Sequence, residues 1–132
     1  MREILFRGKR TDCEAWVEGD LIQAFRGNQI SACGIMPHTP TAYCWKVEPE
    51  TIGQYTGLTD KNGVRIFEGD IIQSLESSVT GLVQWFPEHS AFMVWCKSAN
   101  EVGFLYECAD IIKVIGNIHD NPELLEGGGG NG

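Results

Sequence analysis

Apolar and aromatic residues of this chain fall into short runs rather than into one long periodic stretch. Turn-forming Gly, Pro, Asn and Asp residues separate the runs, and β-branched and aromatic side chains are frequent inside them. This spacing is typical of a mainly β protein with many short strands. The runs are EILFR, AWVEGDLIQAF, QISACGI, AYCWKV, RIFEGDIIQSL, GLVQWF, AFMVWC, GFLYEC and IIKVIGNI.

One turn and one helix carry clear local signals. The residues DKNG at 60–63 predict a tight turn, because Asn-Gly readily adopts positive φ angles. Near the end of the chain, Asn121 is suited to cap a helix and Pro122 to take its first position. We therefore expect one short C-terminal helix over 121–126. The glycine-rich residues 127–132 are expected to form a flexible tail.

A six-residue pattern occurs twice in the chain. Glu-Gly-Asp, an aliphatic residue, Ile and Gln stand at 18–23 and again at 68–73, an offset of 50 residues. The repeat predicts two degenerate β units, 1–57 and 58–120, with the second unit SH3-like. Units this short seldom hold a core alone, so we expect the two to share one. Further matches are Pro37 with Pro87, Trp45 with Trp95 and, at a larger offset, Ile52 with Ile115.

The repeated pattern favours a turn that leads into a strand. Its glycine permits a positive φ angle, and the aspartate after it can hydrogen-bond the nearby backbone. Gly-Asp-x-Ile followed by a Gly-x-Val strand is similar to a small SH3-like barrel, which we expect as the unit fold. The alternative is a carboxylate cluster for a divalent metal or for acid–base chemistry. The residues of this turn signature are Glu18, Gly19, Asp20, Glu68, Gly69 and Asp70.

Charge is spread unevenly along the 132 residues. The net charge is −8: residues 1–57 contain six basic and seven acidic residues, whereas residues 58–132 contain four and eleven. Non-specific DNA binding needs a basic surface, so we expect no direct binding to duplex DNA. A compact anion fits better at the one basic cluster, which consists of Arg2, Arg7, Lys9 and Arg10.

Composition and the first residues indicate a cytoplasmic protein. The chain is 42% hydrophobic and 21% charged, as in ordinary globular proteins. No apolar run approaches the roughly 18 residues of a membrane-spanning helix. The start, MREILFRGKRTD, lacks the apolar core of a signal peptide. We expect no association with membranes.

Cysteine and histidine positions do not form a recognisable site. The cysteines are odd in number and none are spaced as CxxC, so we expect them to be small buried residues in a reducing compartment. Cys33 with His38 supplies at most two of the four ligands of a zinc site. We therefore expect no metal, no cofactor and no catalytic residues. The three histidines, at 38, 89 and 119, are expected on the surface.

Tryptophan is frequent for a chain of this size. The four tryptophans are expected mainly in the core, with one or two available as a stacking wall for a ring-bearing ligand. Such a wall beside arginine or lysine suits a nucleotide. The candidate ligand-binding residues are Arg7, Lys9, Arg10, Arg26, Trp45, Trp85 and Trp95.

Three segments carry a resemblance to a known family. The run IGQYTGLTDKNGVRIFEGDII, the later VIGNIHDNPELLE and the initial REILFRGK strongly resemble the YopX family of phage and prophage proteins. The resemblance implies a small β-rich protein of bacteriophages and mobile elements. It supplies no catalytic residues to assign to this chain.

The first functional hypothesis is a phage-encoded, non-enzymatic accessory binding protein. It would counteract host defence by sequestering a small nucleotide-type signal or by occluding a host protein. The exposed edge strands of the expected β units also predict a homo-oligomer, because unpaired edges favour pairing between subunits. One alternative is an acidic protein–protein interaction module, and another is a metal-dependent hydrolase.

Overall fold

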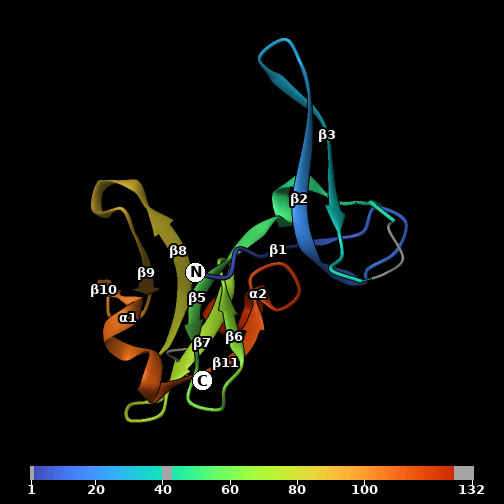
Figure 1. Cartoon of the computed structure of the whole chain (residues 1–132). Coiled ribbons are helices and arrows are strands. Elements are labelled where there is room, and N and C mark those ends of the chain that lie inside the picture. The colour runs from blue at the N-terminus through green and yellow to red at the C-terminus, as the bar shows by residue number, and fades with distance from the viewer. Residues whose placement is uncertain (1, 40–42, 127–132) are drawn as a thin grey trace. The chain divides into compact units, whose positions relative to one another are not determined.

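The computed structural model describes residues 2–39 and 43–126 and divides into two compact units, Met1–Tyr55 and Thr56–Gly132 (Figure 1). The boundary falls inside strand β5 (Gly53–Thr59). Antiparallel strands dominate both units, which confirms the mainly β class. The predicted flexible tail at 127–132 lies outside the described residues.

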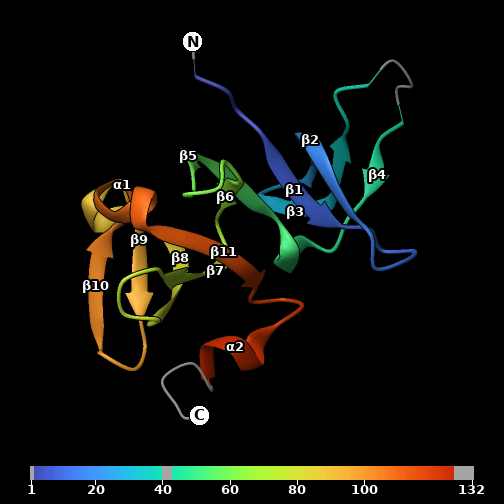
Figure 2. The same ribbon diagram turned by 90° about the horizontal axis from the view of Figure 1, so that it is seen from below.

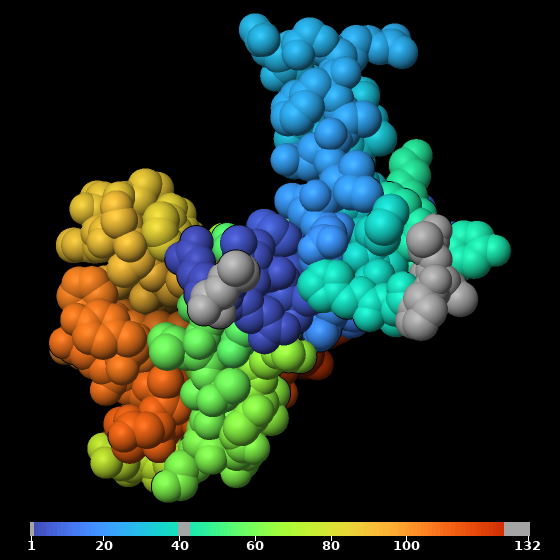
Figure 3. Space-filling view, viewed as in Figure 1, coloured from blue at the N-terminus to red at the C-terminus, as the bar shows by residue number. Residues whose placement is uncertain are grey.

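The first unit is an antiparallel sheet with the strand order β4-β3-β2-β1-β5. β2 and β3 form a long hairpin that reaches well beyond the other strands of this unit (Figures 1 and 3). A 3-10 turn, Pro49–Thr51, precedes β5. The strands are β1 (Phe6–Lys9), β2 (Trp16–Arg26), β3 (Gln29–Met36), β4 (Trp45–Lys46) and the first part of β5.

The second unit contains a five-stranded antiparallel sheet with the order β10-β9-β8-β7-β11, and α1 lies near β9 and β10 (Figure 2). Its strands are β6 (Arg65–Phe67), β7 (Asp70–Ser74), β8 (Thr80–Phe86), β9 (Ala91–Cys96), β10 (Glu101–Phe104) and β11 (Ile112–Asn117). Its helical segments are α1 (Leu105–Cys108), α2 (Pro122–Glu126) and the 3-10 turns Pro87–His89 and Ala109–Ile111.

Each unit has its own buried hydrophobic clusters. In the first unit, Cys33, Ile35 and Val47 form the cluster, and Ile35 is fully buried. In the second unit, the main cluster packs the helical segment, which comprises α1 and the 3-10 turn Ala109–Ile111, against the five-stranded sheet. Ile72 of the sheet and Leu105 of the helical segment both belong to this cluster. The expectation that the two units share one core stays a prediction.

The two sheets are open and do not close into barrels. The prediction of SH3-like barrels is therefore wrong, although the mainly β class is confirmed. The short C-terminal helix is present as α2, with Pro122 at its first position. The DKNG turn is also confirmed, since the Gly63 N–H donates to the Asp60 carbonyl at 3.0 Å and Gly63 has φ +81°.

Two segments differ from the strand pattern expected from sequence. The run GFLYEC was expected to be a strand, but the chain becomes helical at Leu105. The reason is that Leu105 and Ala109, four positions apart, are both buried against the same cluster, which is helical spacing. Strand β5 was missed because its sequence, GQYTGLT, contains glycines and threonines rather than large apolar side chains.

The internal repeat is visible in the register of the strands. Ile35 lies opposite Trp45 in the first unit, and Leu82 lies opposite Trp95 in the second. The preceding strand pairs also correspond. Ile22 of β2 lies opposite Gly34 of β3, and Ile72 of β7 lies opposite Gly81 of β8. The three-strand core β2-β3-β4 therefore corresponds to β7-β8-β9.

Among the described residues, no helix is long and apolar enough to cross a membrane.

Candidate functional site

Two of the candidate cations lie on one face of β1. Arg7 and Lys9 lie on either side of the buried Gly8, and they pair across the sheet with Glu18 and Trp16 of β2. The Arg7 guanidinium lies 4.9 Å from the centre of the Trp16 ring, and the Lys9 ammonium lies 5.9 Å from it. The structure thus forms cation–π contacts on Trp16, which was not among the residues selected from sequence.

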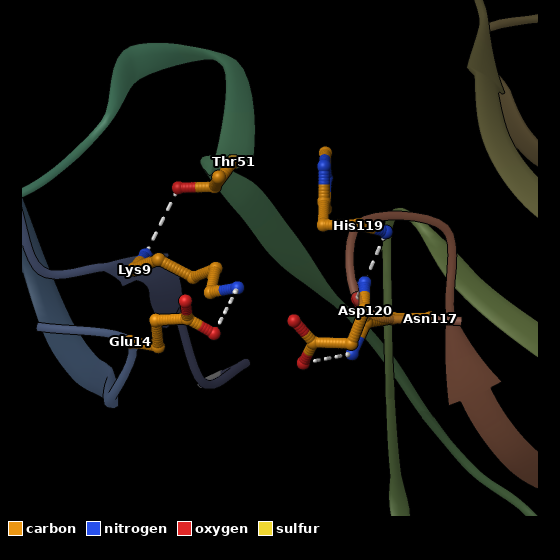
Figure 4. Close-up of polar contacts among 6 residues, drawn as sticks. All are labelled: Lys9, Glu14, Thr51, Asn117, His119 and Asp120. Atoms are coloured by element: carbon orange, nitrogen blue, oxygen red, sulfur yellow. Dashed lines mark hydrogen bonds and ion pairs between the residues drawn. The ribbon is translucent and has the colours of Figure 1, made fainter. Parts of the chain in front are cut away.

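Lys9 is held by its backbone as well as by its side chain (Figure 4). Its backbone N–H donates to the Thr51 hydroxyl at 2.9 Å, and that buried hydroxyl donates onward to the Glu48 carbonyl at 2.7 Å. The Lys9 ammonium lies 3.9 Å from a carboxylate oxygen of Glu14. Only 16% of the Lys9 side chain is exposed, so most of it is already covered by protein.

Arg10 is engaged on two sides. Its guanidinium stacks 3.8 Å from the centre of the Trp45 ring. Its Nε and Nη2 atoms donate to the two carboxylate oxygens of Asp12 at 2.9 and 2.6 Å. This hydrogen bonding raises the pKa of Arg10 and lowers the pKa of Asp12. Trp45 in turn contacts the Tyr43 ring, with centroids 6.0 Å apart.

The other candidate residues lie away from the β1 cations or in the other unit. Arg26 is at the far end of β2, opposite Gln29, and ten residue steps along the strand separate it from Trp16, a distance of about 30 Å. Trp85 belongs to the second unit, where it is 44% exposed and contacts the Phe92 ring edge-on at 5.0 Å. Trp95, also in the second unit, is half-buried against the cluster that contains Ile71. Of the candidate ligand-binding residues, the ones on or next to β1 are therefore Arg7, Lys9, Arg10 and Trp45.

The two copies of the repeated pattern have different conformations. In the first copy, Gly19 lies inside strand β2 with an ordinary φ angle, so the expected turn is wrong there. A Cβ on Gly19 would lie 2.0 Å from the Met36 carbonyl oxygen and 2.7 Å from Pro37 Cα. The glycine is needed because another backbone segment passes directly over it.

The second copy is a turn between β6 and β7. Gly69 has φ +94°, and its N–H donates to the Val83 carbonyl at 2.9 Å. Asp70, only 2% exposed, accepts a hydrogen bond from the Phe67 N–H at 2.8 Å. This carboxylate therefore closes the turn behind it.

The carboxylates of the first copy are placed differently. Glu18 is exposed opposite Arg7, whereas Asp20 lies 2.8 Å from the Nε2 atom of His38. His38 was expected on the surface, where it lies, but its aspartate partner was not foreseen. Within residues 2–39 and 43–126, no group of three or more His, Cys, Asp or Glu residues is placed to hold a metal ion.

A polar turn joins β11 to α2 in the second unit (Figure 4). The Asn117 side-chain oxygen accepts from the N–H groups of His119 and Asp120 at 3.0 and 2.9 Å, and its amide donates to the Asp120 carboxylate. The Asn121 side chain accepts from the Asn117 N–H at 3.3 Å. Asn121 thus stabilises the turn before α2.

Cysteine exposure is mixed. All five thiols are free, and Cys33 is buried as expected. Cys96 and Cys108 are half-buried, and burial raises the pKa of both thiols. Cys13 and Cys44 are exposed, so the expectation that all cysteines are buried is wrong for these two.

The tip of the β2–β3 hairpin is the most exposed part of the first unit. Residues 22–32 are all exposed, and they include the apolar side chains of Ile22, Phe25 and Ile30. Phe25 lies opposite Ile30, next to a β-bulge, and Gly27 turns the chain with φ +66°. The composition of this segment does not differ from that of a half-buried strand, so the sequence pattern does not indicate its exposure.

The chain is similar in fold and sequence to proteins of solved structure. The crystal structure of protein EF1440 from Enterococcus faecalis matches with a TM-score of 0.57 and 27% identity, over 95% of this chain and 99% of that one. No curated protein matches. The family model for YopX protein matches residues 5–126. This match spans nearly the whole chain, and the protein therefore belongs to the YopX family.

Proposed function

We propose that this protein is a phage-encoded, non-enzymatic accessory protein that acts by binding another protein. In this proposal it counteracts host defence in the bacterial cytoplasm by occluding a host protein. The observation that carries the proposal is the exposed β2–β3 hairpin, with Phe25 60% exposed and Ile30 49% exposed at its tip.

The hairpin is hard to explain as a structural element alone. A two-stranded hairpin is at best marginally stable in water unless a third strand or another surface covers it. β1 pairs only with Trp16–Gly19 of β2, and β4 pairs only with Gly34 and Ile35 of β3. In the part of the chain that the structure describes, both outer edges of the tip therefore lack a neighbouring strand. Such edges favour pairing with a strand of another protein.

The charge of the tip indicates the chemistry of the partner. Residues 21–32, LIQAFRGNQISA, contain Arg26 as their one charged residue, although the chain as a whole carries −8. Contact at the tip therefore relies on apolar burial and backbone hydrogen bonds rather than on ion pairs. A surface without acidic residues also allows two copies of this acidic chain to approach, and we extend the proposal to a homo-oligomer that uses the same hairpin.

Site-specific photo-crosslinking tests this proposal. A photoreactive phenylalanine analogue is placed at Phe25 in the full chain, and the protein is produced in the phage's host cells. Tyr106 in the second unit is the matched control position, because it is 64% exposed and also aromatic. Mass spectrometry then identifies what is attached.

The expected result is a discrete adduct between this chain and one host protein from position 25 and none from position 106. An adduct of two copies from position 25 supports the homo-oligomer. A smear without discrete adducts, or the same adducts from both positions, would overturn the proposal.

Sequestration of a nucleotide-type signal is a second candidate. The observation in its favour is the Arg7 guanidinium over the Trp16 ring, since a cation beside an aromatic face suits a ring-bearing anion. The existing contacts of Lys9 and Arg10 with Glu14 and Asp12 compete with such a ligand. Calorimetric titration with cyclic and linear nucleotides decides it: saturable heat that is lost in Trp16→Leu supports sequestration, and no heat across the panel rejects it.

An acidic interaction module is the remaining alternative for a binding role. Residues 58–132 hold four basic and eleven acidic residues, a net charge of −7. Binding through this charge would weaken steeply between low and high salt, whereas contact through the hairpin tip, with its single charge, would change little. Salt dependence of the recovered complex therefore separates the two kinds of binding.

A further inference from the structure

The second unit contains a cavity of about 300 Å³. One side is formed by the face of the five-stranded sheet, through Ile72, Val94 and Ile112, which all belong to the main buried cluster. The other side is formed by Cys108 and Ile111, from the helical segment that packs on this face. All lining residues belong to one unit, so its shape depends on this unit alone.

The missing side chain of Gly103 gives the cavity its room. Strand pairing places Gly103 opposite Val94 and Glu101 opposite Cys96, so these four residues point to the same face of the sheet. A Cβ built on Gly103 has no heavy atom within 4 Å, and its φ angle is ordinary. By contrast, a Cβ on Gly81 of the same face would lie 2.4 Å from Val94. Space is therefore left beside Gly103, whereas Val94 fills the space over Gly81.

The lining is apolar except for one charge. Most of it consists of aliphatic side chains, together with the thiols of Cys96 and Cys108 and two serines. Burial raises the pKa of both thiols, which keeps them neutral at physiological pH. Of the lining residues, all of which the structure describes, Glu101 alone carries a charge, and it lies at the exposed rim.

We propose that this cavity binds a small hydrophobic amine. The apolar body occupies the space beside Gly103, and the ammonium group lies against the Glu101 carboxylate. The volume equals about ten water molecules at about 30 Å³ each, which suits an aromatic ring with a short side chain. A mainly apolar pocket with few oriented polar groups is the usual form of a small-molecule site. This proposal is independent of the hairpin in the first unit.

NMR titration of the full chain tests the proposal with three probes of the same shape. The probes are 2-phenylethylamine, the neutral 2-phenylethanol and the anionic phenylacetate. We expect saturable shifts of the amides around Val94, Gly103 and Cys108 with the amine, weaker binding of the alcohol and the weakest binding of the acid. Because Glu101 is exposed, Glu101→Gln is expected to weaken amine binding about threefold and to leave the alcohol unchanged.

A cavity-filling variant provides the steric test. Gly103→Val places a β-branched side chain in open space on a strand, so the fold is expected to tolerate it. It is expected to abolish binding of the amine. The matched control is Gln84→Val, an exposed position on β8 of the same sheet, which is expected to bind like the wild type.

A second readout does not depend on the variant. The amine is expected to slow alkylation of Cys96 and Cys108, measured by peptide mass spectrometry, while the exposed Cys13 reacts at an unchanged rate. Binding that survives in a folded Gly103→Val, tighter binding of phenylacetate than of the amine, or shifts that map outside the cavity would each overturn the proposal. So would the absence of saturable shifts and of protection with the amine.

Discussion

The Asp60 carboxylate accepts a hydrogen bond from the backbone N–H of Val114, 54 positions further along the chain, at 2.9 Å. Its other oxygen accepts from the N–H groups of Asn62 and Val64 at 2.8 and 2.9 Å. A single side chain, only 6% exposed, thus closes the DKNG turn and attaches it to strand β11. The DKNG turn predicted from the sequence therefore also contributes to the tertiary structure of the second unit.

Replacement of Asp60 is expected to destabilise the second unit strongly. Asp60→Ala removes the acceptors of three backbone N–H groups, which costs about 3 kcal/mol of unfolding free energy. Asp60→Asn keeps one oxygen and is expected to cost less. Urea unfolding followed by circular dichroism measures both. The exposed Asp110→Ala serves as the control and is expected to change stability little; equal losses in Asp60→Ala and Asp110→Ala would contradict the assignment.

Three glycine-to-alanine variants are expected to differ for physical reasons. Gly19→Ala would place a Cβ 2.0 Å from the Met36 carbonyl oxygen, so the backbone must move, at a cost of about 2 kcal/mol. Gly69→Ala is strained by the φ angle of +94°, at a cost of about 1 kcal/mol. Gly103→Ala meets open space and is expected to be neutral or stabilising. Thermal melting ranks the three, and a loss in Gly103→Ala as large as in Gly19→Ala would be inconsistent with this geometry.

The Arg10–Asp12 pair is expected to be visible in the titration of Asp12. The hydrogen bond from Arg10 lowers the pKa of this carboxyl below its usual 3.8. The contribution of the pair to stability is therefore present above about pH 4 and is lost as the pH falls through the lowered pKa. Carboxyl carbon NMR measures the midpoint. In Arg10→Gln it should return toward the usual value, and an unchanged midpoint would refute the pairing.

Thiol reactivity is expected to follow exposure and burial. Cys13 and Cys44 are exposed, whereas burial raises the pKa of Cys96 and Cys108 and so lowers their thiolate fraction. Near pH 8, alkylation by iodoacetamide should therefore label the first two cysteines before the second two. Peptide mass spectrometry over time tests this order. Faster labelling of Cys108 than of Cys13 would show that Cys108 is not packed against the main cluster as described.

The sequence by itself determined the features that depend on local chemistry. Short β-branched and aromatic runs indicated the mainly β class, the DKNG residues indicated their turn, and Pro122 indicated the start of the last helix. The segments around 52–72 and 114–126 also carried the family resemblance that the match over residues 5–126 confirmed. These signals are readable because backbone propensities and turn geometry act over a few neighbouring residues.

Tertiary structure alone decided what each repeated or charged residue does. The same Glu-Gly-Asp sequence forms continuous strand at Gly19, where the Met36 carbonyl leaves no room for a side chain, and a turn with φ +94° at Gly69. Similarly, the tertiary structure places the Arg10 guanidinium over the Trp45 ring. It also places Gly103, which has no side chain, in the lining of a cavity. Such contacts depend on strand register and on which backbone passes over which residue, and a linear pattern of residue types does not encode either.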